Sequence, residues 1–129
     1  MFARRYCFAV VLGMLAASAS GGAVSAQVLD RSQVIRIVVP YTAGGPADVV
    51  ARQLGQRIAA AGGPTIVIDN RTGGGGVVGA MVVKQAAPDG LTLFMTDLPT
   101  FAINATLMTD LPFDPVKDFK PVTTLYAFP

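Results

Sequence analysis

The stretch VIRIVVPYTAGGPADVVARQLGQRIAAA, from Val34 to Ala61, determines the fold class. Residues 34–40 are mostly β-branched and carry a single charge, so they predict a buried strand that is closed by a proline. Residues 47–61 place apolar side chains three and four positions apart, which predicts an amphipathic helix that Gly62-Gly63-Pro64 ends. The predicted buried side of this helix consists of Val50, Leu54, Arg57, Ile58 and Ala61.

The same alternation of strand and helix continues downstream. TIVIDN at residues 65–70 predicts a second strand, the glycine run at residues 73–76 leads into a helix at residues 77–86, and residues 91–96 predict a third strand. Strands that alternate with helices form βαβ units, which require a parallel sheet with helices on its faces. The sequence therefore predicts an α/β fold, a parallel sheet with flanking helices.

The pattern is weaker after Asp97. Residues 101–108 predict a short helix, residues 111–122 contain three prolines and predict a loop, and residues 123–128 predict the start of a strand. Because the chain stops directly after this apolar run, we expect an incomplete domain.

The N-terminus has the three parts of a secretory signal peptide. Arg4 and Arg5 form a positive region, an apolar run extends from Tyr6 to about Ala17, and small residues follow up to Ala26. The apolar run is shorter than the roughly 20 residues that a membrane span needs. We predict a signal peptide at residues 1–26 with cleavage after Ala26, and hence a periplasmic protein. A buried N-terminal helix and a twin-arginine signal are less favoured interpretations.

Composition excludes several classes of function for the predicted mature chain, residues 27–129. The chain contains no histidine, and its one cysteine, Cys7, lies in the predicted signal peptide, which excludes disulfides and thiolate metal sites and makes a metal centre or a catalytic site unexpected. Eight lysines and arginines balance eight aspartates in residues 27–129, so there is no basic surface for nucleic acid. The 103 residues suffice for one modest domain.

Three loops follow the carboxyl ends of the predicted strands, where open parallel sheets bind their ligands. They comprise residues 40–48, 70–76 and 96–101. In the first loop, Gly44 and Gly45 allow a ligand to approach backbone N–H groups, and the start of the helix adds partial positive charge, which suits a carboxylate. For Asp48 we favour a role in the first helical turn, holding the loop or an ordered water, over direct contact with an anion.

The second loop permits a different interpretation. Gly74, Gly76 and Gly79 satisfy the dinucleotide-binding fingerprint, and Asp97 ends the next strand, so a nucleotide-dependent enzyme is an alternative function. Against it, three residues separate the strand from the motif, and four consecutive glycines match many patterns by chance. We therefore expect no enzyme and no cofactor.

Four blocks together resemble the Bug family, the periplasmic receptors of tripartite tricarboxylate transporters. They are IRIVVPYTAGGPADVVAR (35–52), VIDNRTGGGGVVGA (67–80), APDGLTL (87–93) and FAINATLMTDLPFDPVKDFKPVT (101–123). The resemblance implies lobe I of a type II periplasmic-binding-protein fold, with residues 27–129 as an incomplete N-terminal lobe. It also implies a receptor that closes over a small organic anion, typically a di- or tricarboxylate, and delivers it to a membrane permease.

The resemblance also assigns a ligand site. In the family the loop after the first strand grips a carboxylate through backbone groups and bound water, and the loop after the third strand presents small residues to the ligand. The matching positions here are Tyr41, Thr42, Ala43, Gly44, Gly45, Asp48, Thr96, Asp97 and Thr100. Asp97, Leu98 and Pro99 depart from the short neutral residues that the family usually has here, and Asp97 is the departure that bears on the ligand. It indicates either an amino acid, amide or neutral acid derivative as ligand, or a residue that points to solvent or caps the following helix.

The missing second lobe leaves a third possibility. A lone sheet that lacks its returning strand has an unpaired edge, and hinge closure normally buries the ligand between two lobes. The chain by itself is therefore either one lobe of a receptor or a fragment without function.

Overall fold

The computed structural model describes residues 31–125, so the predicted signal peptide at residues 1–26 lies outside the described residues. The first strand and helix are β1 (Val34–Val39) and α1 (Pro46–Ala60), as the sequence predicts. The remaining elements are β2 (Thr65–Asn70), the short 3-10 turn η1 (Gly74–Gly76), α2 (Val77–Lys84), β3 (Thr92–Phe94) and α3 (Leu98–Leu107).

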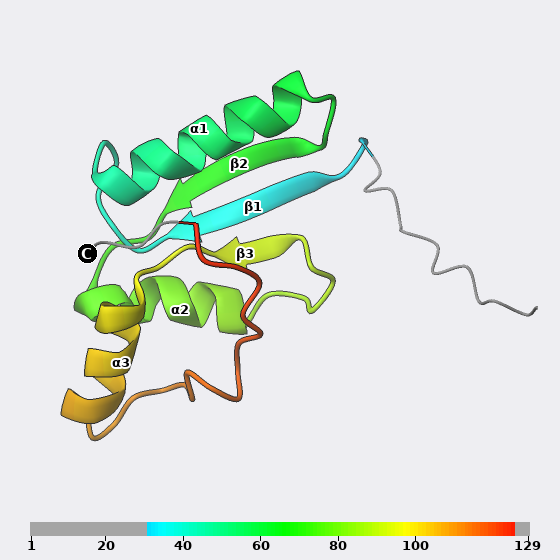
Figure 1. Cartoon of the computed structure of the whole chain (residues 1–129). Helices are drawn as coiled ribbons and strands as arrows, with labels where there is room; N and C mark the ends of the chain where they lie inside the picture. Colours follow the sequence, from blue (N-terminus) through cyan, green and yellow to red (C-terminus); the bar gives the residue numbers. More distant parts are fainter. Residues whose placement is uncertain (1–30, 126–129) are drawn as a thin grey trace, which may run out of the picture.

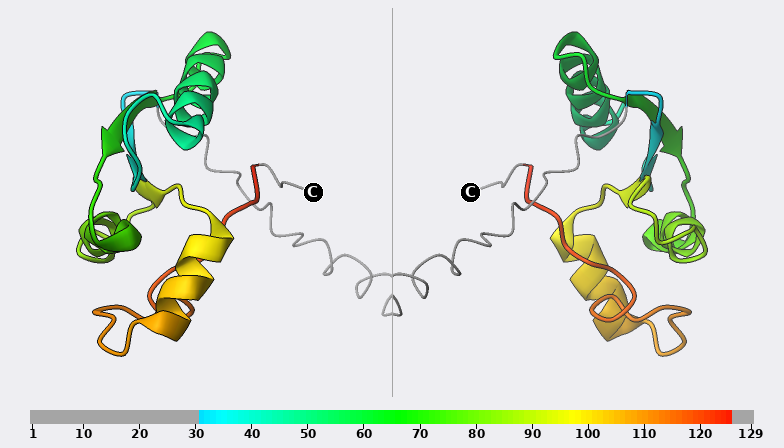
Figure 2. Two further views of the ribbon diagram at one scale, coloured as in Figure 1. Left: turned by 90° about the vertical axis from the view of Figure 1, so that its left-hand side faces the viewer. Right: turned by 90° about the vertical axis from the view of Figure 1, so that its right-hand side faces the viewer.

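The three strands form one parallel sheet in the order β2-β1-β3. β1 is the central strand and pairs along its whole length with β2, from Val34 opposite Thr65 to Val39 opposite Asn70. α1 lies on one side of the sheet and α2 on the other (Figures 1 and 2). The predicted α/β fold with a parallel sheet is confirmed.

The core beneath α1 combines branched residues of the sheet with small residues of the helix. Ile37 and Val39 of β1 are buried together with Ala47 and Ala51 of α1 and with Met95. α1 comes so close to the sheet that a Cβ at Gly55 would lie 3.2 Å from the Cβ of Ile66. Val50 and Leu54 pack against this core as predicted, whereas Arg57 and Ala61, predicted on the same side of the helix, are exposed.

The opposite side of the sheet is also closely packed. Val38 is fully buried there, and a Cβ at Gly79 of α2 would lie 3.1–3.2 Å from Pro40, Phe94 and the Arg71 carbonyl oxygen. The third glycine of the fingerprint-like motif therefore allows α2 to pack against the sheet.

Arg36 is the only charged residue of β1 and is half-buried. Its guanidinium donates hydrogen bonds to the Asp69 carboxylate on the neighbouring strand, and Arg71 donates to the same carboxylate at 3.0 Å. Burial alone would raise the pKa of Asp69, but the hydrogen bonds from Arg36 and Arg71 outweigh it, so the pKa lies below its usual value.

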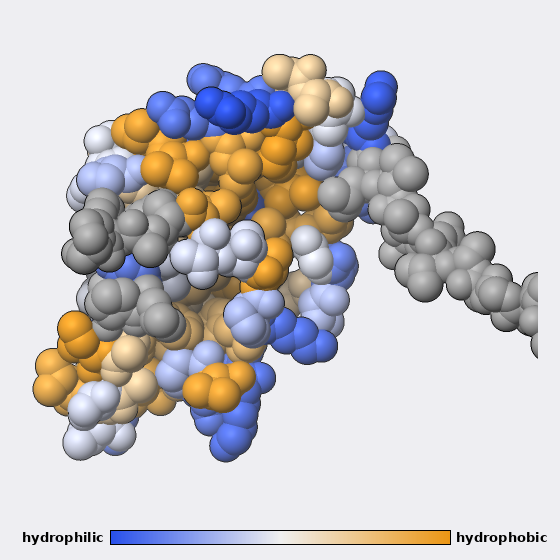
Figure 3. Space-filling model, viewed as in Figure 1, coloured by the Kyte–Doolittle hydropathy of each residue, from blue (hydrophilic) through white to orange (hydrophobic). Residues whose placement is uncertain are grey.

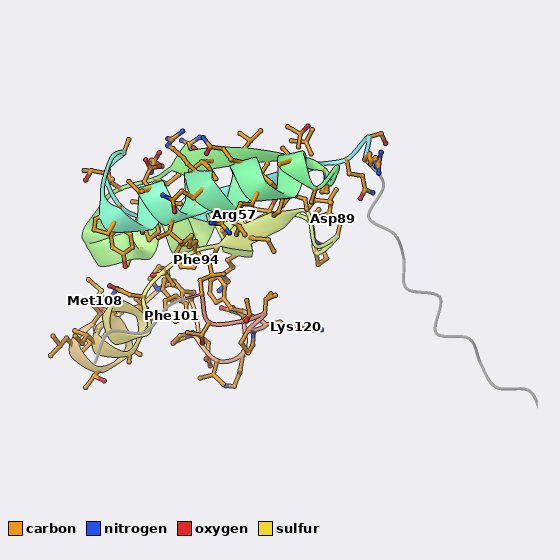
Figure 4. All side chains as sticks on the ribbon, turned by 45° about the horizontal axis from the view of Figure 1, so that its top comes forward. Arg57, Asp89, Phe94, Phe101, Met108 and Lys120 are labelled. Carbon is orange, nitrogen blue, oxygen red and sulfur yellow. The ribbon has the colours of Figure 1, made fainter. Side chains whose placement is uncertain are left out.

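A cluster of four phenylalanines packs the C-terminal part of the described chain against β3 of the sheet. The rings of Phe94 and Phe101 lie 5.9 Å apart (Figure 4), and Phe113 and Phe119 stack on or against them at 5.2–5.9 Å. Outside this cluster, Ile103 and Leu107 of α3 have exposed apolar side chains. Figure 3 shows hydrophobic surface at the lower left of the molecule, over the region of α3.

The boundaries of the later elements differ from the prediction. α3 begins at Leu98 rather than at residue 101, and β3 is limited to Thr92–Phe94, although Met95 N–H still donates to the Val38 carbonyl oxygen at 2.9 Å. Residues 111–122 form the predicted loop. Residues 123–125 of the predicted final strand are not in a strand, and residues 126–128 lie outside the described residues. Within residues 31–125, no helix is both long and apolar enough to span a bilayer.

Candidate functional site

The carboxyl ends of all three strands lie at the same edge of the sheet, where α1 also begins (left side of Figure 1). The loops after β1, β2 and β3 therefore meet there, as predicted for a parallel sheet. Most of the predicted site residues belong to the first and third of these loops.

The loop after β1 is a tight turn that depends on glycine. Gly44 has a φ of +82°, in the left-handed region that residues with a side chain rarely adopt. Gly45 is extended and precedes α1, and its N–H donates to the Thr42 carbonyl oxygen at 3.2 Å. A Cβ at Gly45 would lie 3.2 Å from that same oxygen, whereas a Cβ at Gly44 would meet no atom within 4 Å. Thr42 and Ala43 are exposed at the tip of the turn.

Asp48 holds this turn in place. Its side chain is 2% exposed, and its Oδ2 accepts hydrogen bonds from Arg52 Nε and from the Gly44 N–H, both at 2.8 Å. The hydrogen bond from Arg52, followed by those from Gly44 and Asn70, lowers the pKa of Asp48 to about 2 despite its burial. The carboxylate thus stays ionised, faces its own loop, and is a poor proton acceptor at neutral pH.

Asn70, the last residue of β2, is a part of this network that the sequence prediction did not include among the site residues. Its Nδ2 donates to Asp48 Oδ1 and to the Tyr41 carbonyl oxygen, each at 3.1 Å. Its Oδ1 accepts a longer hydrogen bond from Arg52 at 3.4 Å. Its position at a strand end was visible in the sequence, but its partners, 22 and 29 positions away, were not.

Tyr41 connects the first loop to the third. Its hydroxyl lies 3.4 Å from Thr96 Oγ1 and accepts a hydrogen bond from the Asp97 N–H at 3.3 Å. The structure therefore brings Tyr41, Thr96 and Asp97 together, while Gly44, Gly45 and Asp48 form the adjacent turn. Thr96 and Asp97 are partly exposed.

The other predicted residues of the third loop lie at the start of α3. Asp97 directly precedes this helix, and its carbonyl oxygen accepts a hydrogen bond from the Phe101 N–H at 3.3 Å. Thr100 belongs to the first turn of α3, and its side chain lies outside the described part of the chain. Both interpretations of Asp97, as helix cap and as ligand-selecting residue, stay predictions.

The glycine loop after β2 is occupied by its own hydrogen bonds. Residues 73–76 all have positive φ, which explains why all four are glycines. The N–H groups of Gly76 and Val78 donate to the Gly73 carbonyl oxygen, and that of Val77 donates to Gly74. A dinucleotide pyrophosphate would need such N–H groups at the helix start. Asn104 of α3 closes the loop with a 2.6 Å hydrogen bond to the Gly75 carbonyl oxygen.

The Gly44 and Gly45 N–H groups, which the sequence analysis expected to face a ligand, already donate to Asp48 and to the Thr42 carbonyl oxygen. Among residues 31–125 there is no group of three potential metal-ligating His, Cys, Asp or Glu side chains. The first N–H groups of α1, at Ala47 and Asp48, have no acceptor one turn earlier in the helix, and the helix start carries partial positive charge. This arrangement suits the binding of an anionic group.

Comparison with known proteins finds relatives among transport receptors. Residues 50–129 match the family model described as tripartite tricarboxylate transporter family receptor. A UPF0065 protein of Bordetella bronchiseptica is 36% identical over 98 residues, which cover 76% of this chain and 29% of the relative.

Two solved structures share the fold at useful sequence identity. MatC from Rhodopseudomonas palustris, solved with bound malate, is 42% identical with a TM-score of 0.63, over 69% of this chain and 30% of that chain. The periplasmic binding protein BugD is 32% identical with a TM-score of 0.59, over 68% of this chain and 29% of that one. The chain thus spans about three-tenths of the length of the proteins that it matches.

Proposed function

The chain belongs to the tripartite tricarboxylate transporter receptor family. From this we propose that it forms the lobe of a periplasmic solute receptor that binds the carboxylate group of the ligand. The complete receptor captures a small organic anion, a di- or tricarboxylate or a related acid, and presents it to a membrane permease. The matched proteins are receptors and binding proteins. We propose the same class here, without catalysis and without a cofactor.

The turn between β1 and α1 is the observation that carries the proposal. Gly44 and Gly45 keep side chains away from the backbone, and Asp48 fixes the turn from within at 2.8 Å. A carboxylate that reaches this edge meets N–H groups at the start of α1, where the helix dipole favours negative charge by about 0.3–1 kcal/mol. Because hydrogen bonds within the chain already fix the turn, little ordering remains to be done on binding.

The remaining proposed ligand-binding residues surround this turn. Tyr41, Thr42 and Ala43 lead into the turn, and the hydroxyl of Thr96 lies near the Tyr41 hydroxyl at the neighbouring strand end. Asp97 and Thr100 follow in the chain, directly before and within the first turn of α3. The malate bound to MatC, a protein 42% identical to this chain, supports a dicarboxylate as the ligand class. For Asp48 we propose an indirect role, since its carboxylate is occupied by Gly44, Arg52 and Asn70.

We also propose the export route and the domain organisation on the same basis. Residues 1–26 act as the signal peptide, and residues 27–129 form the N-terminal lobe to which a second lobe adds. Supporting evidence is the similarity to the periplasmic protein BugD and the coverage of only 29% of its chain.

Thermal-shift measurements on the complete protein that carries this chain test the proposed function. The panel contains malate, succinate, citrate and, as the probe for the alternative enzyme, NAD. We expect at least one carboxylate to raise the melting temperature and NAD to leave it unchanged. A rise with NAD and with none of the carboxylates would refute the receptor.

A glycine pair provides a matched test of the turn. Gly44 and Gly90 have φ values of +82° and +79°, and a Cβ at either would meet no atom within 4 Å, but Gly90 lies in the loop that enters β3 at the far end of the sheet. We expect Gly44→Val to weaken carboxylate binding more than tenfold and Gly90→Val to leave it within twofold. Equal losses of affinity would remove the turn from the ligand site.

A further inference from the structure

A single chain of hydrogen bonds joins all three strand-end loops. It runs from Arg52 of α1 to Asp48, from Asp48 to Asn70 at the end of β2, and from Asn70 to the Tyr41 carbonyl group after β1. The Tyr41 hydroxyl then reaches the Asp97 N–H after β3. Asn70 stands in the middle of this chain and is the only one of its described members that comes from β2.

The chemistry at this position requires an amide. The Tyr41 carbonyl oxygen and Asp48 Oδ1 are both acceptors, and each lies 3.1 Å from the same Asn70 nitrogen. A side-chain NH₂ group has two hydrogens and can serve both acceptors at once, whereas a carboxylate or an apolar side chain can serve neither. The amide oxygen, 3.4 Å from an Arg52 nitrogen, completes the contact with α1.

Tyr41 extends the contact with Asn70 to the loop after β3. Its backbone is held by Asn70 through the carbonyl group, and its hydroxyl contacts both Thr96 and the Asp97 N–H at 3.3–3.4 Å. A displacement of the Tyr41 backbone therefore moves the hydroxyl on which the third loop depends. The hydrogen bonds that Asn70 donates lead to Tyr41 and Asp48, so we expect its effect on the loop after β3 to pass through Tyr41.

We propose that Asn70 is a positioning residue of the ligand site, which fixes the turn after β1 and couples it to the loop after β3 through Tyr41. This inference rests on the proposed function, because the two loops are those assigned to the ligand. It adds a residue that touches the loops rather than the carboxylate. A site that is preformed in this way loses less conformational entropy when the ligand binds.

Amide hydrogen exchange of the ligand-free chain tests the coupling independently of any ligand. Asn70→Ala removes both donors, and Val67→Ala is the matched control because it shortens a 45% exposed side chain in the middle of the same strand. We expect exchange of the Gly44 and Asp97 amides to become about tenfold faster in Asn70→Ala, and to be unchanged in Val67→Ala. Unchanged exchange at Asp97 overturns the coupling, since a purely local role would affect Gly44 alone.

Binding of malate to the complete protein tests the consequence for the site. We expect Asn70→Ala to raise the dissociation constant about tenfold and Val67→Ala to leave it unchanged. If exchange accelerates while the dissociation constant stays the same, Asn70 is structural and the proposal is wrong. If the unaltered protein binds none of the carboxylates, the proposed function fails, whereas the exchange result still decides whether Asn70 couples the loops.

Asn70→Asp adds a pH profile that a merely structural loss would not show. Near neutral pH the new carboxylate faces Asp48 and cannot donate, so we expect binding as weak as in Asn70→Ala or weaker. At lower pH the two carboxyl groups share a proton that replaces one lost donor, and we expect affinity to recover between pH 7.5 and about pH 5. Of the charged groups, Asp48 and Arg52 contact residue 70 directly, and Asp69 and Arg71 are its neighbours in the chain. All of them are also present in Asn70→Ala, so equal pH profiles of the two variants contradict the proposal.

Discussion

Replacement of Gly44 by alanine should destabilise the lobe through the backbone rather than through a clash. Gly44 has a φ of +82°, and an added Cβ would meet no atom within 4 Å. A residue with a side chain in this left-handed conformation costs about 1–2 kcal/mol. Loss of a flexible glycine from the unfolded chain returns about 0.4–1 kcal/mol. We therefore expect a net loss on the order of 1 kcal/mol in the free energy of unfolding.

Urea titration monitored by circular dichroism measures this loss on residues 27–129. For a domain of this size, about 1 kcal/mol corresponds to a fall in melting temperature of about 4–8 °C. Asparagine tolerates the left-handed region better than other residues with a side chain, so Gly44→Asn should lie between glycine and alanine.

Gly90→Ala is the matched control, because Gly90 has nearly the same φ, +79°, and the same open surroundings. Both alanine variants should lose similar stability, while only Gly44→Ala disturbs the hydrogen bond to Asp48. The reasoning is refuted if Gly44→Ala is as stable as the parent chain, or if asparagine is worse than alanine at this position.

Three further predictions concern packing and pH. A Cβ at Gly79 would already lie 3.1–3.2 Å from three neighbours, so Gly79→Val should lower the free energy of unfolding by about 2 kcal/mol in urea titration. A loss below about 0.5 kcal/mol would contradict the close packing of α2. Phe113 is 5% exposed within the aromatic cluster, so Phe113→Ala should lower the free energy of unfolding by about 3 kcal/mol. It should also release residues 111–120 from the sheet, which faster proteolysis of that loop would show. The pKa of Asp48 is lowered from 3.8 to about 2, so the ionised carboxylate contributes fully to stability above about pH 4, and this contribution is lost as the pH falls through 2. The difference in unfolding free energy between the parent chain and Asp48→Asn should therefore shrink in acid. A difference that stays constant with pH would contradict the role of the Asp48 carboxylate.

The secondary structure was predictable where one local feature, such as a β-branched run or a glycine pair, determines where an element lies. The β-branched runs at residues 34–39 and 65–70 form strands with the predicted limits to within one residue, because such side chains favour the extended backbone and the buried sheet. The glycine pair at residues 62–63 ends α1 as expected. β3 and α3 were less well delimited, because their ends depend on pairing with β1 and on packing of the phenylalanines.

The buried side of α1 was only partly predictable. Periodicity of apolar residues placed Arg57 inward, but the buried apolar residues of the helix are Ala47 and Ala51, and Gly55 lets the helix approach Ile66 of β2. Small residues carry little hydrophobic signal, so a pattern of apolar side chains underestimates them.

The candidate site was predictable in location but not in its internal connections. Strand ends of a parallel sheet must share one edge, which placed Gly44, Asp48 and Thr96 near one another in advance. The hydrogen bonds from Asn70 to Asp48 and from the Asp97 N–H to Tyr41 join residues 22 and 56 positions apart in the sequence, and no local pattern reveals such pairs.

Titration of the ¹⁵N-labelled complete protein with malate, followed by amide chemical shifts, tests the central claim most directly. If the turn after β1 grips a carboxylate, the largest shift changes in this lobe will be at Gly44, Gly45 and Ala47, with smaller changes at Thr96 and Asp97. Shift changes centred on residues 73–79, or changes caused by NAD and not by any carboxylate, would contradict the claim and favour the dinucleotide alternative.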